Sequence, residues 1–390
     1  MKKSKIIAAV LPAVLAVSCE VTYNEVDESS GNEERYAVRL DEVAEILSMI
    51  PIQKAQVEEV HDAVSSSSSN GYDEEYTMRH IFESPGAGVG DNMSKSAGSY
   101  VKPLRALIEE QVRSMPATRS LSMDPDRFLE ILTDSDVQIY WPFSDEWDGE
   151  TLPVITFDPE DGASANIGYR FTIEDDGSRH VEEVVVDEAM AEKVPVWVVN
   201  RNDDAGYTSL EMLRREDPDW GEGGGSIIVK SRLKTLILKD FTMKRNYDSW
   251  FAGASEFFVK IGYLDNFTAS TEAELRLYSP MVTDFMIVVK RKHVGVPQPF
   301  NAILMTDWST QLESCAFMIT EDDGGTQTEW SSKAKVFVAG KSYGVEVTIP
   351  MNIRDDIVWR GQLSTRWFEE GNGRTWPFGD VELTFEVLGS

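Results

Sequence analysis

Cysteine is nearly absent from this chain of 390 residues, which contains only Cys19 and Cys315. A scaffold stapled by several disulfides is therefore excluded, and hydrophobic cores must stabilise the two or three domains that this length allows. Cys315 lies in the segment LESCAFMIT, whose alternation is typical of a strand. The pattern predicts a buried and unreactive thiol.

Histidine is also scarce, and the four copies are far apart. None of them lies in an HExxH motif or beside a second histidine or cysteine, so the sequence does not favour a zinc site. No serine lies in a GxSxG elbow. A pair of carboxylates is the one hydrolytic chemistry that the sequence leaves open.

Basic residues are few compared with acidic ones. The chain has 37 lysines and arginines against 67 aspartates and glutamates, a formal charge of −30. A surface this acidic repels phosphate groups, so nucleic acid and anionic membrane surfaces are not expected partners. Cations and basic proteins remain compatible with it.

Long apolar runs are missing apart from a short one near the N-terminus. Lys2, Lys3 and Lys5 precede the apolar segment 6–17, which is too short to span a bilayer and suits a secretory leader. The run ends in LAVSC, which resembles the lipobox of bacterial lipoproteins. The resemblance implies a signal peptide over residues 1–18, acylation of Cys19 with palmitate-type chains, and membrane attachment through the lipid.

Residues 19–37 carry many acids and no apolar run, and they are predicted to form an acidic tether. Acids just after the lipidated cysteine resemble the surface-export signal of Bacteroidetes lipoproteins. The implied location is the outer membrane of a Gram-negative bacterium, with the protein displayed at the cell surface.

The fold class predicted from the sequence is mainly β with a helical N-terminal region. Residues 38–134 show apolar residues at helical spacing around a Ser/Gly-rich loop, and Asp124 with Pro125 marks a helix start. Residues 135–220 show short alternating segments separated by acidic turns, typical of a small β-rich domain. Residues 226–390 contain nine candidate strands, which predict an antiparallel β-sandwich.

The order of helices followed by strands resembles lipoproteins of Bacteroidetes that have no assigned activity. The segment NYDSWFAGASEFFVKIG (246–262) carries most of this resemblance. A calcium-dependent C2 domain is a weaker similarity, based on the number of strands and on EDDGG (321–325).

Acid-bearing turns are candidates for a calcium site, because Ca²⁺ takes six to eight oxygen ligands and neighbouring loops can supply them. The candidate ligands are Asp158, Asp161, Asp175, Asp176, Asp322 and Asp323. Such Asp-Gly turns also occur in any antiparallel sheet. The sequence therefore implies no required cofactor, with calcium as an alternative.

Three of the ten tryptophans lie beside Gly, Ser or Asp residues, outside the alternating segments: Trp250, Trp367 and Trp376. They are candidates for an exposed platform that binds a glycan or a protein, and core packing is the alternative. We expect a non-enzymatic binding or display protein. The alternatives are a carboxylate-based hydrolase of glycans or peptides, and a docking subunit of an envelope assembly.

Overall fold

Helices fill the N-terminal part of the described chain where apolar residues recur at helical spacing. The computed structural model describes residues 38–83, 102–115, 123–173, 179–202, 207–216 and 234–389. The predicted acidic tether lies outside these residues. The helices are α2 (Leu40–Met49), α3 (Lys54–Ser69), α4 (Met78–Glu83), α5 (Leu104–Ser114) and α6 (Pro125–Asp134). The side chain of Asp124 accepts hydrogen bonds from the first turn of α6, as its sequence predicts.

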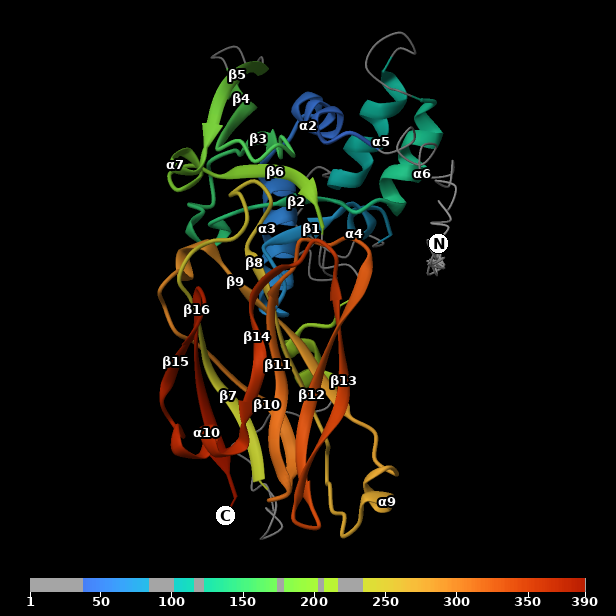
Figure 1. The fold of residues 1–390 in the computed structure, drawn as a ribbon. Helices are drawn as coiled ribbons and strands as arrows, with labels where there is room; N and C mark the ends of the chain where they lie inside the picture. Colours follow the sequence, from blue (N-terminus) through green and yellow to red (C-terminus); the bar gives the residue numbers. More distant parts are fainter. Residues whose placement is uncertain are drawn as a thin grey trace, which may run out of the picture. The chain divides into compact units, whose positions relative to one another are not determined.

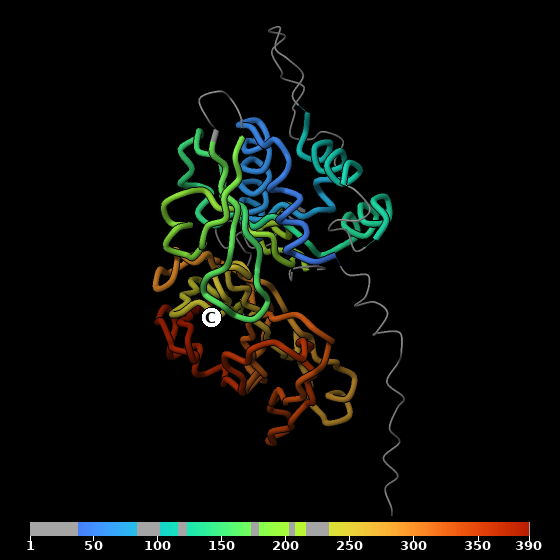
Figure 2. The backbone as a smooth tube through the Cα atoms, turned by 90° about the horizontal axis from the view of Figure 1, so that it is seen from above, coloured from blue at the N-terminus to red at the C-terminus, as the bar shows by residue number. Residues whose placement is uncertain are grey.

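A six-stranded sheet, called sheet A, packs beside these helices (Figures 1 and 2). Its strands are β1 (Glu75–Thr77), β2 (Val137–Tyr140), β3 (Val154–Phe157), β4 (Ala165–Ile173), β5 (Arg179–Asp187) and β6 (Val196–Arg201). Their order is β1-β2-β6-β3-β4-β5, and β3 pairs with β6 in parallel while the other pairs are antiparallel. One apolar cluster contains residues of α2, α3, α5 and α6 together with Trp141 and Trp197. The helices and sheet A therefore share a core, and together they are called the N-terminal αβ region.

Three short helical segments accompany this region. They are η2 (Ser144–Glu146), α7 (Glu188–Ala191) and α8 (Leu210–Glu216). The side chain of Asp187 accepts a hydrogen bond from Met190 N and so caps α7.

Two antiparallel sheets form the sandwich, residues 234–389, and confirm the mainly β fold class. Sheet B has the order β10-β7-β16-β15, and sheet C has the order β13-β12-β11-β8-β9 with β14 also paired to β11. The strands are β7 (Lys234–Met243), β8 (Ser255–Tyr263), β9 (Met281–Val289), β10 (Gln298–Trp308), β11 (Leu312–Glu321), β12 (Gln327–Val338), β13 (Lys341–Asn352), β14 (Asp356–Ser364), β15 (Thr375–Phe378) and β16 (Val381–Leu388). The helical segments are α9 (Glu272–Leu275), η3 (Arg291–His293) and α10 (Thr365–Glu370).

Strand β8 is buried along its whole length. One of its faces contributes Phe257, Val259 and Ile261 to the sandwich core. The other face is covered by the hairpin of β12 and β13, because a Cβ placed on Gly262 would lie 2.2 Å from Val347 Cγ1. Lys260 lies on this second face and donates a hydrogen bond to the carbonyl of Pro350 in β13, 2.9 Å away. Sheet C therefore curls until its own hairpin packs against β8.

The N-terminal αβ region and the sandwich belong to one compact unit, residues 38–390. The carboxylate of Asp73 accepts a hydrogen bond from Ala254 N at 3.0 Å, and Lys290 forms an ion pair with Glu74 at 3.2 Å. Trp250 and Phe251 of the β7–β8 connection pack in one cluster with residues of sheet A. The junction thus combines an apolar contact with buried charges.

Several elements differ from the sequence prediction. One of the nine candidate strands in residues 226–390 is the segment AELRLYS (273–279), but its first residues belong to helix α9, whose N-cap Thr271 accepts a hydrogen bond from Glu274 N. That strand prediction is wrong because local capping outweighs the apolar alternation. Strands β1, β14 and β15 and helices α4 and α10 are additional elements that the pattern did not predict.

Candidate functional site

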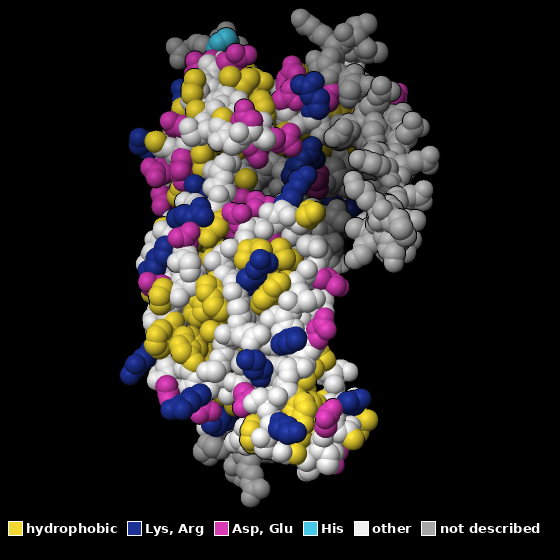
Figure 3. All heavy atoms as spheres, viewed as in Figure 1, with side chains coloured by type: hydrophobic (Ala, Val, Ile, Leu, Met, Phe, Trp, Pro, Cys, Tyr) yellow, Lys and Arg dark blue, Asp and Glu magenta, His cyan; other side chains and the backbone are white. Residues whose placement is uncertain are grey.

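A polar cleft of about 740 Å³ lies between the ends of strands β2, β3 and β6 of sheet A and the turn that joins β11 to β12. Its lining carries four carboxylates, two guanidinium groups, three carboxamides and one phenol. These are Asp136, Asp158, Glu160 and Asp323, then Arg201 and Arg354, then Asn202, Gln327 and Asn352, and Tyr207. Figure 3 shows acidic and basic side chains together where the N-terminal αβ region meets the sandwich. A ligand in this cleft would contact mostly polar atoms.

Arg201 organises the wall formed by sheet A. Its guanidinium bridges two carboxylates, with Nη1 2.8 Å from Asp136 Oδ1 and Nε 2.9 Å from Glu160 Oε1. Asp158 follows β3, and its Oδ1 accepts a hydrogen bond from Glu160 N at 2.9 Å. Burial raises the pKa of Asp158, and the nearby carboxylates add to the effect. Asp136 and Glu160 thus share the single positive charge of Arg201, while Asp158 lies beside like charges.

The opposite wall is the tight turn after β11. Asp322 Oδ1 accepts hydrogen bonds from Gly324 N at 3.0 Å and from Asn352 Nδ2 at 2.9 Å. Gly324 and Gly325 both have positive φ, 65° and 100°, which glycine adopts without strain. This turn presents Asp323 to the cleft, and burial is the main cause of the raised pKa of its carboxyl.

Behind this wall lies a buried group of charged side chains. Asp322 is 1% exposed and Asp355 is 7% exposed. Burial, together with contact with Asp322, raises the pKa of Asp355 to about 7. The charge of Lys260 acts in the opposite direction on the pKa of Asp355, and Lys260 Nζ also lies 3.4 Å from Asp284 Oδ2. One carboxyl group with a pKa of about 7, that of Asp355, therefore lies behind this wall of the cleft.

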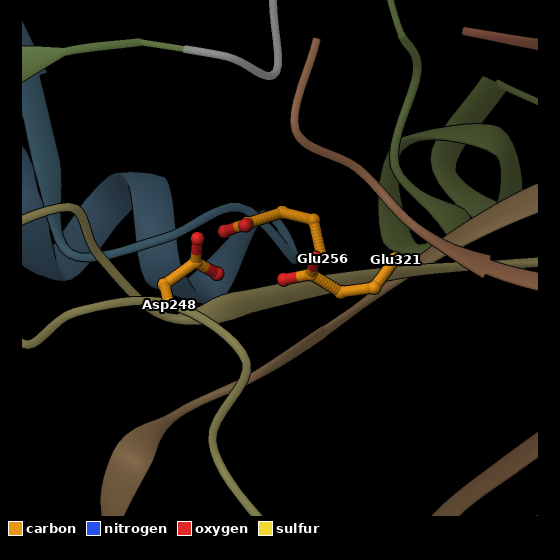
Figure 4. A group of neighbouring side chains, drawn as sticks. All are labelled: Asp248, Glu256 and Glu321. Atoms are coloured by element: carbon orange, nitrogen blue, oxygen red, sulfur yellow. The ribbon is translucent and has the colours of Figure 1, made fainter. Parts of the chain in front are cut away.

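A second acidic cluster lies at the ends of β8 and β11. Oxygens of Asp248, Glu256 and Glu321 all lie within 4.8 Å of one another, and the three side chains converge in Figure 4. Asp248 comes from the β7–β8 connection, and burial raises its pKa to about 6. Through one oxygen each, the three carboxylates provide three of the six to eight oxygens that Ca²⁺ takes.

The six acids predicted as calcium ligands do not form one cluster in the described residues. Asp158 and Asp323 line the cleft, and Asp322 lies behind its wall. Asp161 caps a turn by accepting a hydrogen bond from Ala163 N. Asp175 and Asp176 lie outside the described residues.

The predicted tryptophan platform is only partly consistent with the structure. Trp250 is 3% exposed, stacks on Phe251 and donates a hydrogen bond to the carbonyl of Ser164, so the expectation that it is exposed is wrong. Trp367 and Trp376 are half-buried with ring centroids 4.9 Å apart, and both pack against the sandwich core. Apolar side chains gather on the face over β15 and β16 (Figure 3).

Sequence reasoning did not select Asp248, Glu256 or Asp355. A signal for Glu256 and Lys260 was present, because both charged residues interrupt the apolar segment SEFFVKIGYL. A charged residue inside a strand that is buried on both faces needs a partner. The sequence contains no comparable signal for Asp248, which lies in an irregular connection.

Comparisons with protein-family models, with curated proteins and with solved structures found no match to this chain. None of the helices in the described ranges is long and apolar enough to cross a membrane. The geometry of the cleft is therefore the structural observation that bears most directly on function.

Proposed function

We propose that this protein is a lipid-anchored component of the envelope of a Gram-negative bacterium, displayed at the cell surface, which binds a polar, positively charged ligand without catalysing a reaction. The observation that supports a binding role is the polar cleft at the ends of β2, β3 and β6. The leader that ends at Cys19 supports the anchor.

The charge of the cleft favours a cationic ligand. Four carboxylates against two arginines leave an excess of two negative charges along the lining. Removal of the three leader lysines leaves the rest of the chain with 34 basic and 67 acidic residues, so the long-range field has the same sign. A basic segment of another protein satisfies both conditions better than a neutral glycan does.

The test uses the full chain in detergent with two labelled peptides, one rich in lysine and arginine and one in which glutamate replaces those residues. Fluorescence anisotropy should show binding of the basic peptide only, and affinity should fall as salt is added. Asp323→Asn should weaken binding about threefold to tenfold, since it removes one exposed charge of the cleft wall. Asp161→Asn is the matched control because it removes an acid outside the lining. Equal binding of both peptides, or equal effects of both variants, would contradict the proposal.

A carboxylate-based hydrolase is the second candidate, and one observation favours it. Asp158 and Asp323 line the same cleft, and burial raises the pKa of both carboxyls, as a general acid requires. A screen of fluorogenic glycosides, esters and peptides decides between the two functions. Turnover that Asp158→Asn abolishes and Asp161→Asn preserves would establish catalysis.

The anchor has a separate test. Two or more acyl chains give stable membrane attachment, whereas one gives only marginal binding. Cys19→Ala should therefore move the protein out of the membrane fraction and abolish labelling by a palmitate analogue. Labelling that persists in this variant would exclude acylation at Cys19.

A further inference from the structure

A small cavity of about 140 Å³ lies between the β2–β3 connection and the α7–β6 connection, with a different lining from the polar cleft. Its lining includes three aromatic residues, Trp141, Phe143 and Trp147. Three carboxylates also line it: Glu146, Asp148 and Glu192. Its volume is close to that of an engineered cavity of about 150 Å³ that holds one benzene molecule, although its lining is more polar. It has room for a group of about six heavy atoms.

The rings are held in place by the protein itself. Trp141 is 1% exposed and packs edge-on against Trp197, with centroids 6.0 Å apart. Trp147 donates a hydrogen bond from Nε1 to the carbonyl of Thr151 at 2.9 Å and contacts the ring of His61. Binding of a ligand would therefore cost little conformational entropy of these side chains.

Phe143 adds a backbone observation at the same cavity. Its φ of 59° and ψ of 29° place it in the left-handed region, which a bulky residue seldom adopts. Such strain persists where the surrounding structure requires one particular placement. In this conformation Phe143 lines the cavity.

The carboxylates give the cavity a net negative charge. Asp148 accepts hydrogen bonds from Glu150 N, Thr151 N and Thr151 Oγ1, and these bonds lower its pKa to about 2. Glu146 and Glu192 are exposed, and neither forms an ion pair within the described residues. Lys193 also lines the cavity and supplies one positive charge against the three negative charges of these carboxylates.

We infer that this cavity binds an organic ammonium group, the cation of a choline-like headgroup or of a lysine-type amine. Aromatic rings attract such cations through their quadrupole and tolerate their alkyl groups, and the carboxylates supply the opposite charge. An anion would be repelled by the three carboxylates. The inference is independent of the proposed function, because the cavity and the cleft have different lining residues.

The experiment is a titration of the full chain in detergent with tetramethylammonium, choline and n-butylammonium. Calorimetry and tryptophan fluorescence measure the binding. The neutral isostere of choline, with carbon in place of nitrogen, has the same shape without the charge. We expect it to bind at least about tenfold more weakly than choline. A preference for choline would indicate a headgroup source, and a preference for n-butylammonium would indicate a lysine side chain.

Variants locate the binding in this cavity. Trp147→Leu should weaken choline binding about tenfold or more, and Glu192→Gln about threefold. Glu150→Gln is the matched control, because Glu150 lies in the same loop, pairs with Lys54 and does not line the cavity. If Trp147→Leu fails to fold, Trp147→Phe and Glu192→Gln carry the test. Absence of ammonium binding, equal binding of the isostere, or unchanged binding in Trp147→Phe and Glu192→Gln would overturn the inference.

Discussion

Ala339 has a backbone conformation that alanine adopts at a cost. It precedes Gly340 in the two-residue turn between β12 and β13, and both have positive φ, 49° and 84°. Two-residue hairpin turns of this kind favour Asn-Gly, because asparagine tolerates the left-handed region and alanine does not. The turn therefore contains a strain that a single substitution can relieve.

We expect Ala339→Asn to raise the free energy of unfolding by about 0.5–1 kcal/mol. Gly340→Ala is the converse change and should destabilise by a similar amount or more, although its Cβ would meet no other atom. Thermal unfolding of both variants beside the wild type checks the prediction. A stabilised Gly340→Ala variant would show that the turn is not under this strain.

Asp248 is the second residue with a local consequence. Its pKa of about 6 results mainly from burial, and Glu321 and Asp323 are close enough to influence it. We expect Asp248→Asn to stabilise the protein at pH 8 in a chelator by about 1–2 kcal/mol, since neutralising one of three converging carboxylates removes repulsion. Glu329→Gln, an exposed change in β12, should have little effect. A rise in Tm on adding calcium, present in the wild type and lost in Asp248→Asn, would instead show that a cation balances the cluster.

At the scale of elements, the contact between the β12–β13 hairpin and β8 is the most unusual feature. Gly262 leaves the space that Val347 fills, so each residue depends on the other. Close packing of this kind makes both enlargement and truncation costly.

A double-mutant cycle tests this contact. Gly262→Ala should cost about 1–3 kcal/mol through overpacking, and Val347→Ala should cost a similar amount through the cavity it leaves. The double variant should be more stable than the sum of the two losses predicts, because the new methyl group occupies the vacated space. Strict additivity would mean that the hairpin does not cover β8 at this position.

At the scale of the whole molecule, buried carboxyls link stability to pH. Burial raises the pKa of Asp73 to about 6, of Asp355 to about 7 and of Glu75 to about 8. An acid whose pKa is higher in the folded state than in the unfolded state binds its proton more tightly when folded. Its stabilising effect is fully present below the unfolded pKa and is lost as pH rises through the folded pKa.

We therefore expect Tm to fall between about pH 5 and pH 8, by roughly 2–4 °C for each kcal/mol lost. Glu75→Gln should flatten the slope between pH 7 and pH 8, because Glu75 is the group with a pKa of about 8. Glu58→Gln, an exposed change on α3, should leave the slope unchanged. A Tm that rises steadily over this range would contradict the assignment of these carboxyls as protonated in the folded state.

Elements with a strong local pattern could be predicted from the sequence. The helices α2, α3, α5 and α6 and eight of the nine predicted sandwich strands appear where apolar residues recur at the expected period. Asp124 and Pro125 marked the start of α6 because capping involves only neighbouring residues. The buried thiol of Cys315, with a pKa of about 12, followed from its place in an alternating strand. Periodicity is a local property, so the sequence by itself determined these features.

Only the tertiary structure decided which charged residues meet. Asp158 and Asp323 are far apart in the chain, and they line one cleft because sheet A and the β11–β12 turn face each other there. Glu256 and Glu321 lie at the paired ends of β8 and β11, where Glu321 is opposite Phe257, the chain neighbour of Glu256. Register depends on long-range packing, and a shift by one residue would turn each side chain to the other face. Composition and local pattern therefore predicted strands and acidic turns, while the strand pairing placed their carboxylates together.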